Sequence, residues 1–241
     1  MHQKTRGIVL HSIKYGERGL ITTIYTESFG RMSFIMQGIH SKKSVVKANL
    51  LRQLSLLEME VDFRHGHELQ RVREIKNSSP FSTIPYEITK STQALFLAEL
   101  LFKVLREEES RPELFAFLYG SIQFLDLMEE GISNFHLLFL IQLSRYLGFA
   151  PTNNYSASEP YFDLIAGKFA ISPPDHPWHL KESESEILSK LLEMNYQDAL
   201  FFKPDQAIRQ TFISFILEYY GLHLGNKLQI KSLDILKQLF H

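Results

Sequence analysis

The sequence predicts an α+β protein in which a five-stranded β-barrel precedes a mostly α-helical domain. Three observations support this prediction. Hydrophobic residues alternate with polar ones up to about residue 80 and recur at helical spacing afterwards. The turn-forming sequence Ser78-Ser79-Pro80 marks the change, with Pro85 shortly after it. Charge divides at the same place, since residues 1–80 have a net charge of +6 and residues 81–241 a net charge of −7. We therefore expect two domains, 1–80 and 81–241.

The first eighty residues contain five segments with strand character. The clearest alternates Leu57, Met59, Val61 and Phe63 with charged residues, which is typical of a half-buried strand. The spacing of apolar residues within 44–54 predicts a short helix between the third and fourth strands. Five strands in this order are typical of the OB-fold, a small barrel that commonly binds oligonucleotides. The expected strands are 5–12, 20–26, 31–37, 57–64 and 68–76.

The most strongly charged stretch is 30–52, which contains five basic residues and no acidic one. A segment with charge of one sign attracts polyanions such as nucleic acid. The alternative interpretation is a solvated loop on a basic face. Tyr15 lies in a basic turn, where its ring could stack on a base. The candidate nucleic-acid-binding residues are Arg31, Lys42, Lys43, Lys47, Lys14, Arg18, Arg52 and Tyr15.

The sequence after residue 80 predicts helices that are interrupted by an irregular insert at about 149–180. Ser110 and Glu113 have the spacing of a capping box, and Gly148 is placed to end a helix. A hairpin is expected in the insert, turning at Ala166-Gly167. The expected helices are 88–105, 110–131, 132–147, 183–194, 204–221 and 233–240.

Motifs of common enzyme classes are absent from the sequence, including phosphate-binding glycine loops and the HExxH zinc motif. We therefore expect a binding protein that is not an enzyme and needs no cofactor. The chain has no cysteine, which excludes disulfides and thiolate metal sites and favours a reducing cytoplasm. His176 and His179 have metal-ligand spacing but lack a third partner, so a loop role is favoured. We expect neither a signal peptide nor a membrane span.

Four patches of the sequence resemble RecO, the recombination-mediator family of bacterial DNA repair. Their order along the chain is that of the family, and together they span nearly its whole length. The patches are Gly7 to Leu10 with Tyr15-Gly16-Glu17 and Tyr25-Thr26; Phe29-Gly30-Arg31 with Gln37-Gly38 and Lys42-Lys43; Tyr146 to Pro151 with Tyr161-Phe162-Asp163 and Gly167; and Tyr219-Tyr220 with His223-Leu224 and Lys231 to Leu236.

The resemblance implies an N-terminal OB-fold, a helical C-terminal domain, and a protein of the cytoplasm associated with the nucleoid. It implies binding of single- and double-stranded DNA without strong sequence preference, and annealing of complementary strands. The implied partners are RecR and the acidic C-terminal tail of single-stranded DNA-binding protein, which together help to load RecA. Many RecO proteins hold zinc through cysteines after the patch that ends in Pro151. Because 152–155 reads TNNY, we expect no zinc and a loop held by packing of Tyr155, Tyr161, Phe162 and Phe169.

Two other functions remain open from the residues. One is a protein-interaction scaffold whose basic barrel docks an acidic peptide. The other is an OB-fold factor that binds RNA. An acidic peptide should saturate one site, whereas affinity for DNA should rise with strand length. A preference for RNA over DNA of the same sequence would favour the RNA-binding factor.

Overall fold

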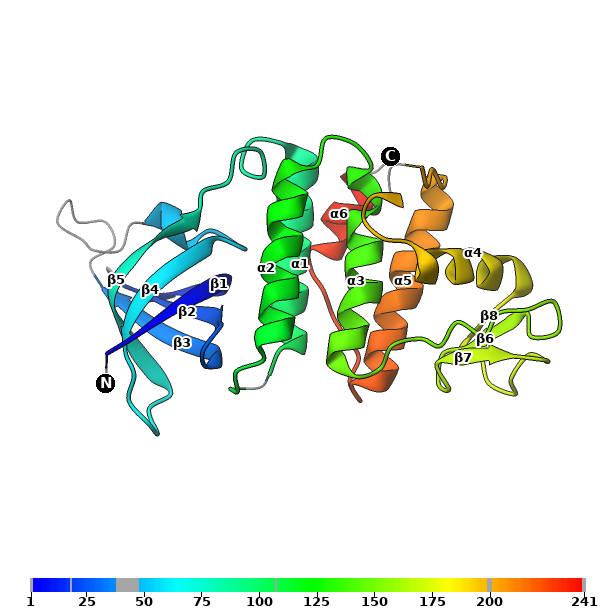
Figure 1. The fold of residues 1–241 in the computed structure, drawn as a ribbon, viewed down its shortest axis with the longest axis horizontal. Helices are drawn as coiled ribbons and strands as arrows, with labels where there is room; N and C mark the ends of the chain where they lie inside the picture. Colours follow the sequence, from blue (N-terminus) through cyan, green and yellow to red (C-terminus); the bar gives the residue numbers. More distant parts are fainter. Residues whose placement is uncertain (1, 18, 38–47, 107, 199–200, 240–241) are drawn as a thin grey trace. The chain divides into compact units, whose positions relative to one another are not determined.

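The computed structural model describes residues 2–17, 19–37, 48–106, 108–198 and 201–239. The chain forms two compact units (Figure 1). The first comprises Met1–Leu127 with Ile230–Leu236, and the second comprises Met128–Gln229 with Lys237–His241. Residues 81–127, which the sequence pattern assigns to the helical domain, thus belong by their contacts to the same unit as the barrel.

The described strands of the first unit close into a barrel in the order β1-β2-β3-β5-β4, which confirms the predicted architecture. All neighbours are antiparallel except β3 and β5, which are parallel. Of the helix predicted within 44–54, residues 48–51 form a 3-10 turn, and 44–47 lie outside the described residues. The elements are β1 (His2–Tyr15), β2 (Gly19–Thr26), β3 (Gly30–Gln37), η1 (Ala48–Leu51), β4 (Leu56–Asp62) and β5 (Leu69–Ser79).

Strand β1 belongs to both sides of the barrel. Its first half pairs with β4 and its second half with β2, and Gly7 lies where the two pairings meet. A Cβ atom on Gly7 would lie 2.6 Å from a methyl group of Ile24, so a larger residue would displace β2. The absence of a side chain lets the strand bend there and close the barrel. The barrel core comprises Val9, Ile24, Phe34, Met36, Leu51, Leu57, Met59, Val61 and Ile75.

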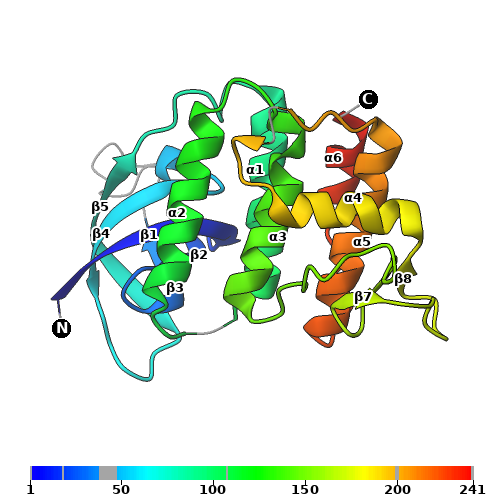
Figure 2. The same ribbon diagram turned by 45° about the vertical axis from the view of Figure 1, so that its right-hand side comes forward.

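Helices α1 (Ile88–Val104) and α2 (Pro112–Leu127) complete the first unit, and α1 packs against β1 (Figure 2). The helix expected over 88–105 is present, and its apolar residues differ widely in burial. Ile88 is 69% exposed, whereas Phe96, Leu97 and Leu100 are fully buried, because α1 has neighbours on more than one side. The predicted capping box is wrong, since the hydroxyl of Ser110 donates to the carbonyl oxygen of Glu27 at 2.8 Å.

The segment between barrel and helices is fastened to the end of α2 by Asp126. Its carboxylate accepts backbone N–H groups of Ser82, Thr83 and Ile84 at 2.8, 2.9 and 2.8 Å. Burial alone would raise the pKa of Asp126, but these hydrogen bonds outweigh it and lower the pKa. The ammonium of the buried Lys90 donates to the Asp126 carbonyl oxygen at 3.1 Å. These bonds fix the chain that enters α1.

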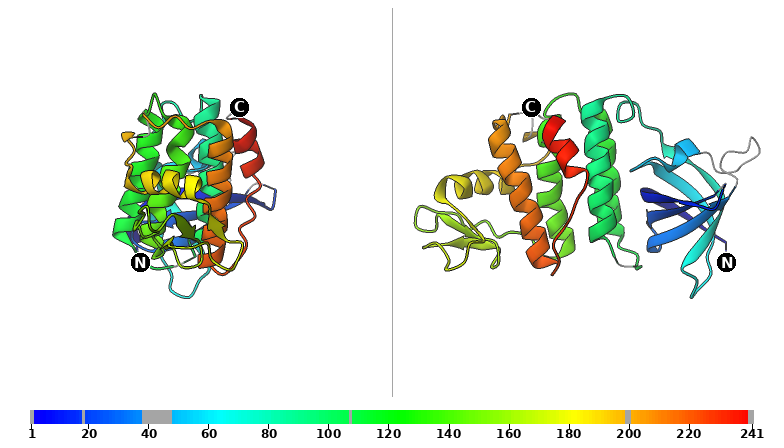
Figure 3. Two further views of the ribbon diagram at one scale, coloured as in Figure 1. Left: turned by 90° about the vertical axis from the view of Figure 1, so that its right-hand side faces the viewer. Right: turned by 180° about the vertical axis from the view of Figure 1, so that it is seen from behind.

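The second unit packs helices against a small sheet of order β7-β6-β8 (Figure 3). Gly148 ends α3 in the left-handed conformation, as predicted. None of the helices among the described residues is long and apolar enough to cross a membrane. The elements are η2 (Ile132–Asn134), α3 (Phe135–Leu147), β6 (Tyr161–Asp163), β7 (Lys168–Ala170), β8 (His179–Leu180), α4 (Glu182–Glu193) and α5 (Gln206–His223), and α6 (Leu233–Leu239) completes the chain.

The predicted hairpin of the insert is present as β6 and β7, and aromatic packing holds it. Phe162 and Phe169 are buried, and the ring of Tyr155 meets Phe169 edge-on at 5.3 Å. Asn154, which no sequence pattern singles out, exchanges two hydrogen bonds with the backbone of Phe169. The hydroxyl of Tyr161, by contrast, donates to Glu182 in a more exposed position.

The two histidines of the insert make internal contacts. His176 Nε2 lies 3.4 Å from a carboxylate oxygen of Asp163, and His179 Nδ1 lies 2.8 Å from the carbonyl oxygen of His176. Among the described residues, no group of three or more histidines, cysteines, aspartates or glutamates is arranged to hold a metal ion. His176 lies in a loop, as expected, whereas His179 begins strand β8 and pairs with Asp163.

Two predicted limits of α5 are wrong. The helix begins at Gln206, because the carboxylate of Asp205 accepts the N–H of Ile208 at 2.8 Å and caps it there. It also continues past Gly221 to His223. A Cβ atom at Gly221 would lie 3.2 Å from the carbonyl oxygen of Asn226. Gly221 therefore leaves room for the backbone at Asn226 to pass close to the helix, and it does not end the helix.

Candidate nucleic-acid interface

Helices α1 and α2 cover one part of the outer face of β1, β2 and β3. Ile8 and Tyr25 pair across β1 and β2 and are both buried. The ring of Tyr25 stacks at 6.4 Å from that of Phe115 in α2, and His11 packs at 4.6 Å from Phe102 in α1. This part of the face is filled by protein side chains and leaves no room for bases.

Arg31 lies under this cover. Its guanidinium lies 4.5 Å from the ring centre of Phe102, and Nη1 donates to the carbonyl oxygens of Phe102 and Leu105, both at 2.8 Å. These carbonyls belong to the C-terminal end of α1, where the helix dipole favours a cation. Burial, and then repulsion from Arg106, lower the pKa of the guanidinium, which still stays charged at neutral pH. Arg31 thus joins the barrel to α1 and lies at the opposite end of β3 from Lys14 and Tyr15.

The outer face is uncovered toward the turn between β1 and β2. Strand pairing sets Ile13 beside Ile21 and Ile21 beside Ile35, so the three side chains share one face. The parallel pairing of Ile35 with Arg71 extends this row onto β5. Ile13, at one end of the row, is 50% exposed, and Arg71, at the other end, is also exposed. We call this surface the open face, and it comprises Ile13, Tyr15, Ile21, Ile35, Leu69 and Arg71.

Strand β1 ends with Lys14 and Tyr15 at the edge of the open face. Tyr15 is 49% exposed, and Lys14 is exposed on the opposite side of the strand because neighbouring residues alternate. Gly16 has φ +62, which suits a tight turn. Gly19 pairs with Gln37, so β3 ends beside this turn, just before residues 38–47. The structure therefore places Tyr15 near Gln37, the last residue of β3.

Arg71 is a candidate that the sequence analysis missed. It makes no ion pair within the described residues, and its neighbour Gln70 is buried, which fixes the outward direction of Arg71. The alternation of Gln70, Arg71, Val72 and Arg73 could have shown that both arginines point outward. The parallel pairing with β3, which places Arg71 on the open face, joins residues 36 positions apart and leaves no local signal.

Arg52 lies elsewhere, on the exposed end of η1, where it lines a hollow beside the ends of β4 and β5. Arg18, Lys42, Lys43 and Lys47 lie outside the described residues, so their candidate role remains a prediction. Of the four candidates that are described, the structure brings only Lys14 and Tyr15 together.

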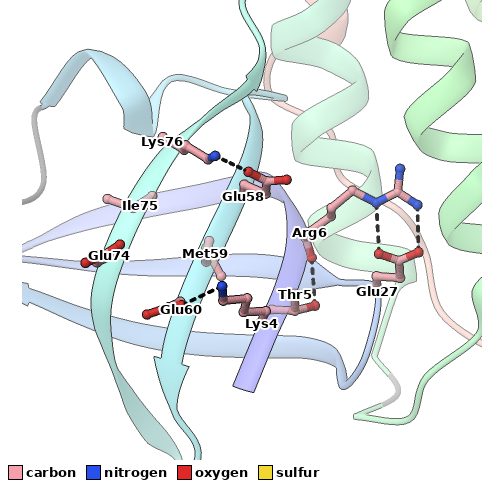
Figure 4. Close-up of a pocket in the computed structure, with 10 residues that line it drawn as sticks. All are labelled: Lys4, Thr5, Arg6, Glu27, Glu58, Met59, Glu60, Glu74, Ile75 and Lys76. Atoms are coloured by element: carbon pink, nitrogen blue, oxygen red, sulfur yellow. Dashed lines mark hydrogen bonds and ion pairs between the residues drawn. The ribbon is translucent and has the colours of Figure 1, made fainter. Parts of the chain in front are cut away.

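A second surface, on β1, β4 and β5, combines cations with carboxylates (Figure 4). Lys4 lies 3.1 Å from Glu60, and Lys76 lies 2.6 Å from Glu58. Figure 4 shows these side chains reaching across neighbouring strands toward each other. They border a hollow of roughly 440 Å³. We call this surface the paired face, and it comprises Lys4, Arg6, Glu27, Glu58, Glu60, Glu74 and Lys76.

Arg6 and Glu27 form the most closely bound pair of this face. Two guanidinium nitrogens of Arg6 donate to the two carboxylate oxygens of Glu27 at 2.9 and 2.6 Å. The guanidinium also lies 4.9 Å from the ring centre of Tyr119 in α2. These hydrogen bonds lower the pKa of the Glu27 carboxyl and raise that of Arg6. The basic side chains of the paired face are thus neutralised by carboxylates close to them.

Two family models match the chain. The N-terminal model of recombination protein O matches residues 1–81, and the C-terminal model matches residues 85–233. Relatives named DNA repair protein RecO include those of Bacteroides fragilis, 43% identical, Phocaeicola vulgatus, 41% identical, and Flavobacterium psychrophilum, 33% identical. Each alignment covers 100% of both chains. The chain therefore belongs to the recombination protein O (RecO) family of DNA repair proteins.

Proposed function

We propose that this protein is a recombination mediator that binds single- and double-stranded DNA without strong sequence preference and anneals complementary strands. The observation that carries the proposal is the open face. It combines an exposed ring, Tyr15, with a cation, Arg71, that has no ion-pair partner among the described residues. A ring stacks on any base and a cation binds any phosphate, so neither contact selects a sequence.

Annealing follows from the same chemistry, because cations that neutralise phosphates let two complementary strands approach each other. No covalent chemistry is needed for this role, so we propose that the protein is not an enzyme. We further propose that RecR and the acidic tail of single-stranded DNA-binding protein act as its partners in loading RecA. Family membership supports this assignment.

The first experiment is fluorescence anisotropy of a labelled single strand of about 30 nucleotides, titrated with the full chain across a salt series. With about five phosphate contacts, the slope of log affinity against log salt should be roughly −3 to −4. Several sequences should give the same affinity. Absence of binding at low salt would overturn the proposal.

The basic stretch is tested by reversing Lys42 and Lys43 to Glu. The double variant should weaken binding for every sequence alike and make the salt slope shallower by about 1.4, because two phosphate contacts are lost. Unchanged affinity at low salt would remove these lysines from the DNA-binding site.

A second function, docking of an acidic peptide, is favoured by the apolar row of the open face. Ile13, Ile21 and Ile35 form a row that ends beside Arg71, so apolar and acidic side chains of a peptide would both find partners. A peptide would saturate at one site and compete with DNA there. Affinity that rises with oligonucleotide length and persists with saturating acidic peptide would favour DNA.

A further inference from the structure

A hollow of roughly 200 Å³ lies beside the chain that links the barrel to α1. Its lining contains amides, hydroxyls, two aromatic rings and one cation, and none of the lining residues is acidic. This contrasts with the hollow of the paired face, which four glutamates border. The lining residues are Asn49, Arg52, Ser55, Leu56, Asn77, Ser79, Pro80, Phe81, Pro85 and Tyr86.

Tyr86 supplies an exposed ring at this hollow. Its side chain is 81% exposed, although the backbone that carries it is fixed. The N–H of Tyr86 donates to the carbonyl oxygen of Thr83 at 2.9 Å, and Thr83 is itself bound to the carboxylate of Asp126. Pro85 restricts the backbone immediately before the ring. A solvent-exposed aromatic ring on a rigid backbone is well suited to stack on an unpaired base.

Arg52 supplies the cation, and a strained turn holds it. The N–H of Ser55 donates to the carbonyl oxygen of Arg52 at 3.1 Å and closes a four-residue turn. Leu54, third in this turn, has φ +60 and is fully buried. A leucine rarely adopts this conformation, and such strain is maintained only where the surrounding structure imposes it. Arg52 is exposed and makes no ion pair within the described residues.

We propose that this hollow binds one nucleotide of a single strand, with the base stacked on Tyr86 and a flanking phosphate bound by Arg52. Asn49 and Asn77 offer amide donors and acceptors to the base edge, which gives hydrogen bonding without a fixed sequence requirement. The inference rests on the proposed DNA binding and adds a second contact point, apart from the open face. It also predicts a preference for unpaired bases, because a duplex keeps its bases stacked on each other.

The test compares a labelled single strand of about 30 nucleotides with a duplex of the same sequence, using the full chain. Tyr86→Ala should weaken single-strand binding roughly tenfold through loss of one stack and leave duplex binding unchanged. Tyr86→Phe should keep the wild-type affinity. Arg52→Gln should weaken binding to both, because both contain phosphates. The matched control is Ile88→Ala, which removes a side chain 69% exposed that does not line the hollow.

The outcomes separate this inference from the proposed function. If wild type binds DNA but Tyr86→Ala matches Ile88→Ala, or loses duplex and single-strand affinity equally, the nucleotide site is wrong and DNA binding stands. If wild type binds neither oligonucleotide, both proposals fail. As a direct readout, photocrosslinking of a single strand that contains 5-iodouracil should attach to the peptide that carries Tyr86. Unchanged thermal midpoints of the variants would show that the fold is kept.

Discussion

The open face and the paired face of the barrel carry similar basic side chains with different surroundings. On the paired face, Lys4, Arg6 and Lys76 each lie within 3.1 Å of a glutamate oxygen. On the open face, Arg71 has no such partner within the described residues. A cation already neutralised by a carboxylate gains little from a phosphate. The number of basic residues on a barrel therefore does not locate its polyanion-binding site. Only basic side chains that form no ion pair with a nearby carboxylate are available to bind phosphate.

Removal of two charges, one from Arg71 on the open face and one from Lys14 at its edge, should weaken DNA binding most. Lys14→Gln with Arg71→Gln should make the single-strand salt slope shallower by about 1.4 and reduce affinity at 0.1 M salt roughly 25-fold, since two phosphate contacts are lost. Lys4→Gln with Lys76→Gln removes the same charge from the paired face and should leave the slope unchanged. Anisotropy titrations across salt measure both. Equal weakening by the two variants would mean that net charge alone controls binding.

Arg31 differs from the basic residues of both faces, because its guanidinium donates to backbone carbonyl oxygens of the protein itself. Arg31→Gln should lower the free energy of unfolding by about 1–3 kcal/mol, because two carbonyls at the end of α1 lose a charged donor. The salt slope for DNA should not change. Urea unfolding of this variant and of Arg71→Gln gives the contrast, with Arg71→Gln expected to match wild type. A shallower salt slope for Arg31→Gln would return Arg31 to the DNA-binding set.

The paired face should also contribute to the pH dependence of stability. The pKa of Glu27 is lowered in the folded protein from its ordinary value of 4.5, so its stabilising effect is present above that pH. The effect is lost as pH falls below 4.5 through the folded pKa. Wild type should therefore lose thermal stability more steeply than Glu27→Gln as pH falls below 4.5. Parallel curves for the two proteins would show that the pair with Arg6 contributes nothing.

The smallest effect is expected for the exposed pair of Lys76 and Glu58. The Lys76 side chain is 74% exposed, so water already screens the interaction. Lys76→Gln should leave both the thermal midpoint and the DNA affinity at wild-type values. A measurable loss of stability would show that the ion pairs of this face act as a connected network.

Local sequence pattern predicted the helices and strands more reliably than the contacts that their residues make with other parts of the chain. Alternation between residues 57 and 63 indicated β4, and Gly148 marked the end of α3 because a left-handed residue there needs no other part of the fold. The same reasoning failed for Ser110 and Gly221, whose roles depend on Glu27 and Asn226. Local signals fail where the role of a residue depends on a contact outside its predicted helix, whether that contact is 83 residues away, as for Ser110, or just past the helix end, as for Gly221.

The sequence by itself determined the β-then-α order of the chain, its charge asymmetry and its family, because periodicity, composition and motif order are properties of neighbouring residues. Which cations remain available to bind a polyanion depends on the tertiary structure. Arg31 was selected from a carboxylate-free stretch, yet its partners lie 71 and 74 residues away on α1. Arg71 was overlooked within a polar strand, yet the parallel pairing of β5 with β3 places it on the open face. Availability depends on contacts between segments far apart in the chain, which no local pattern records.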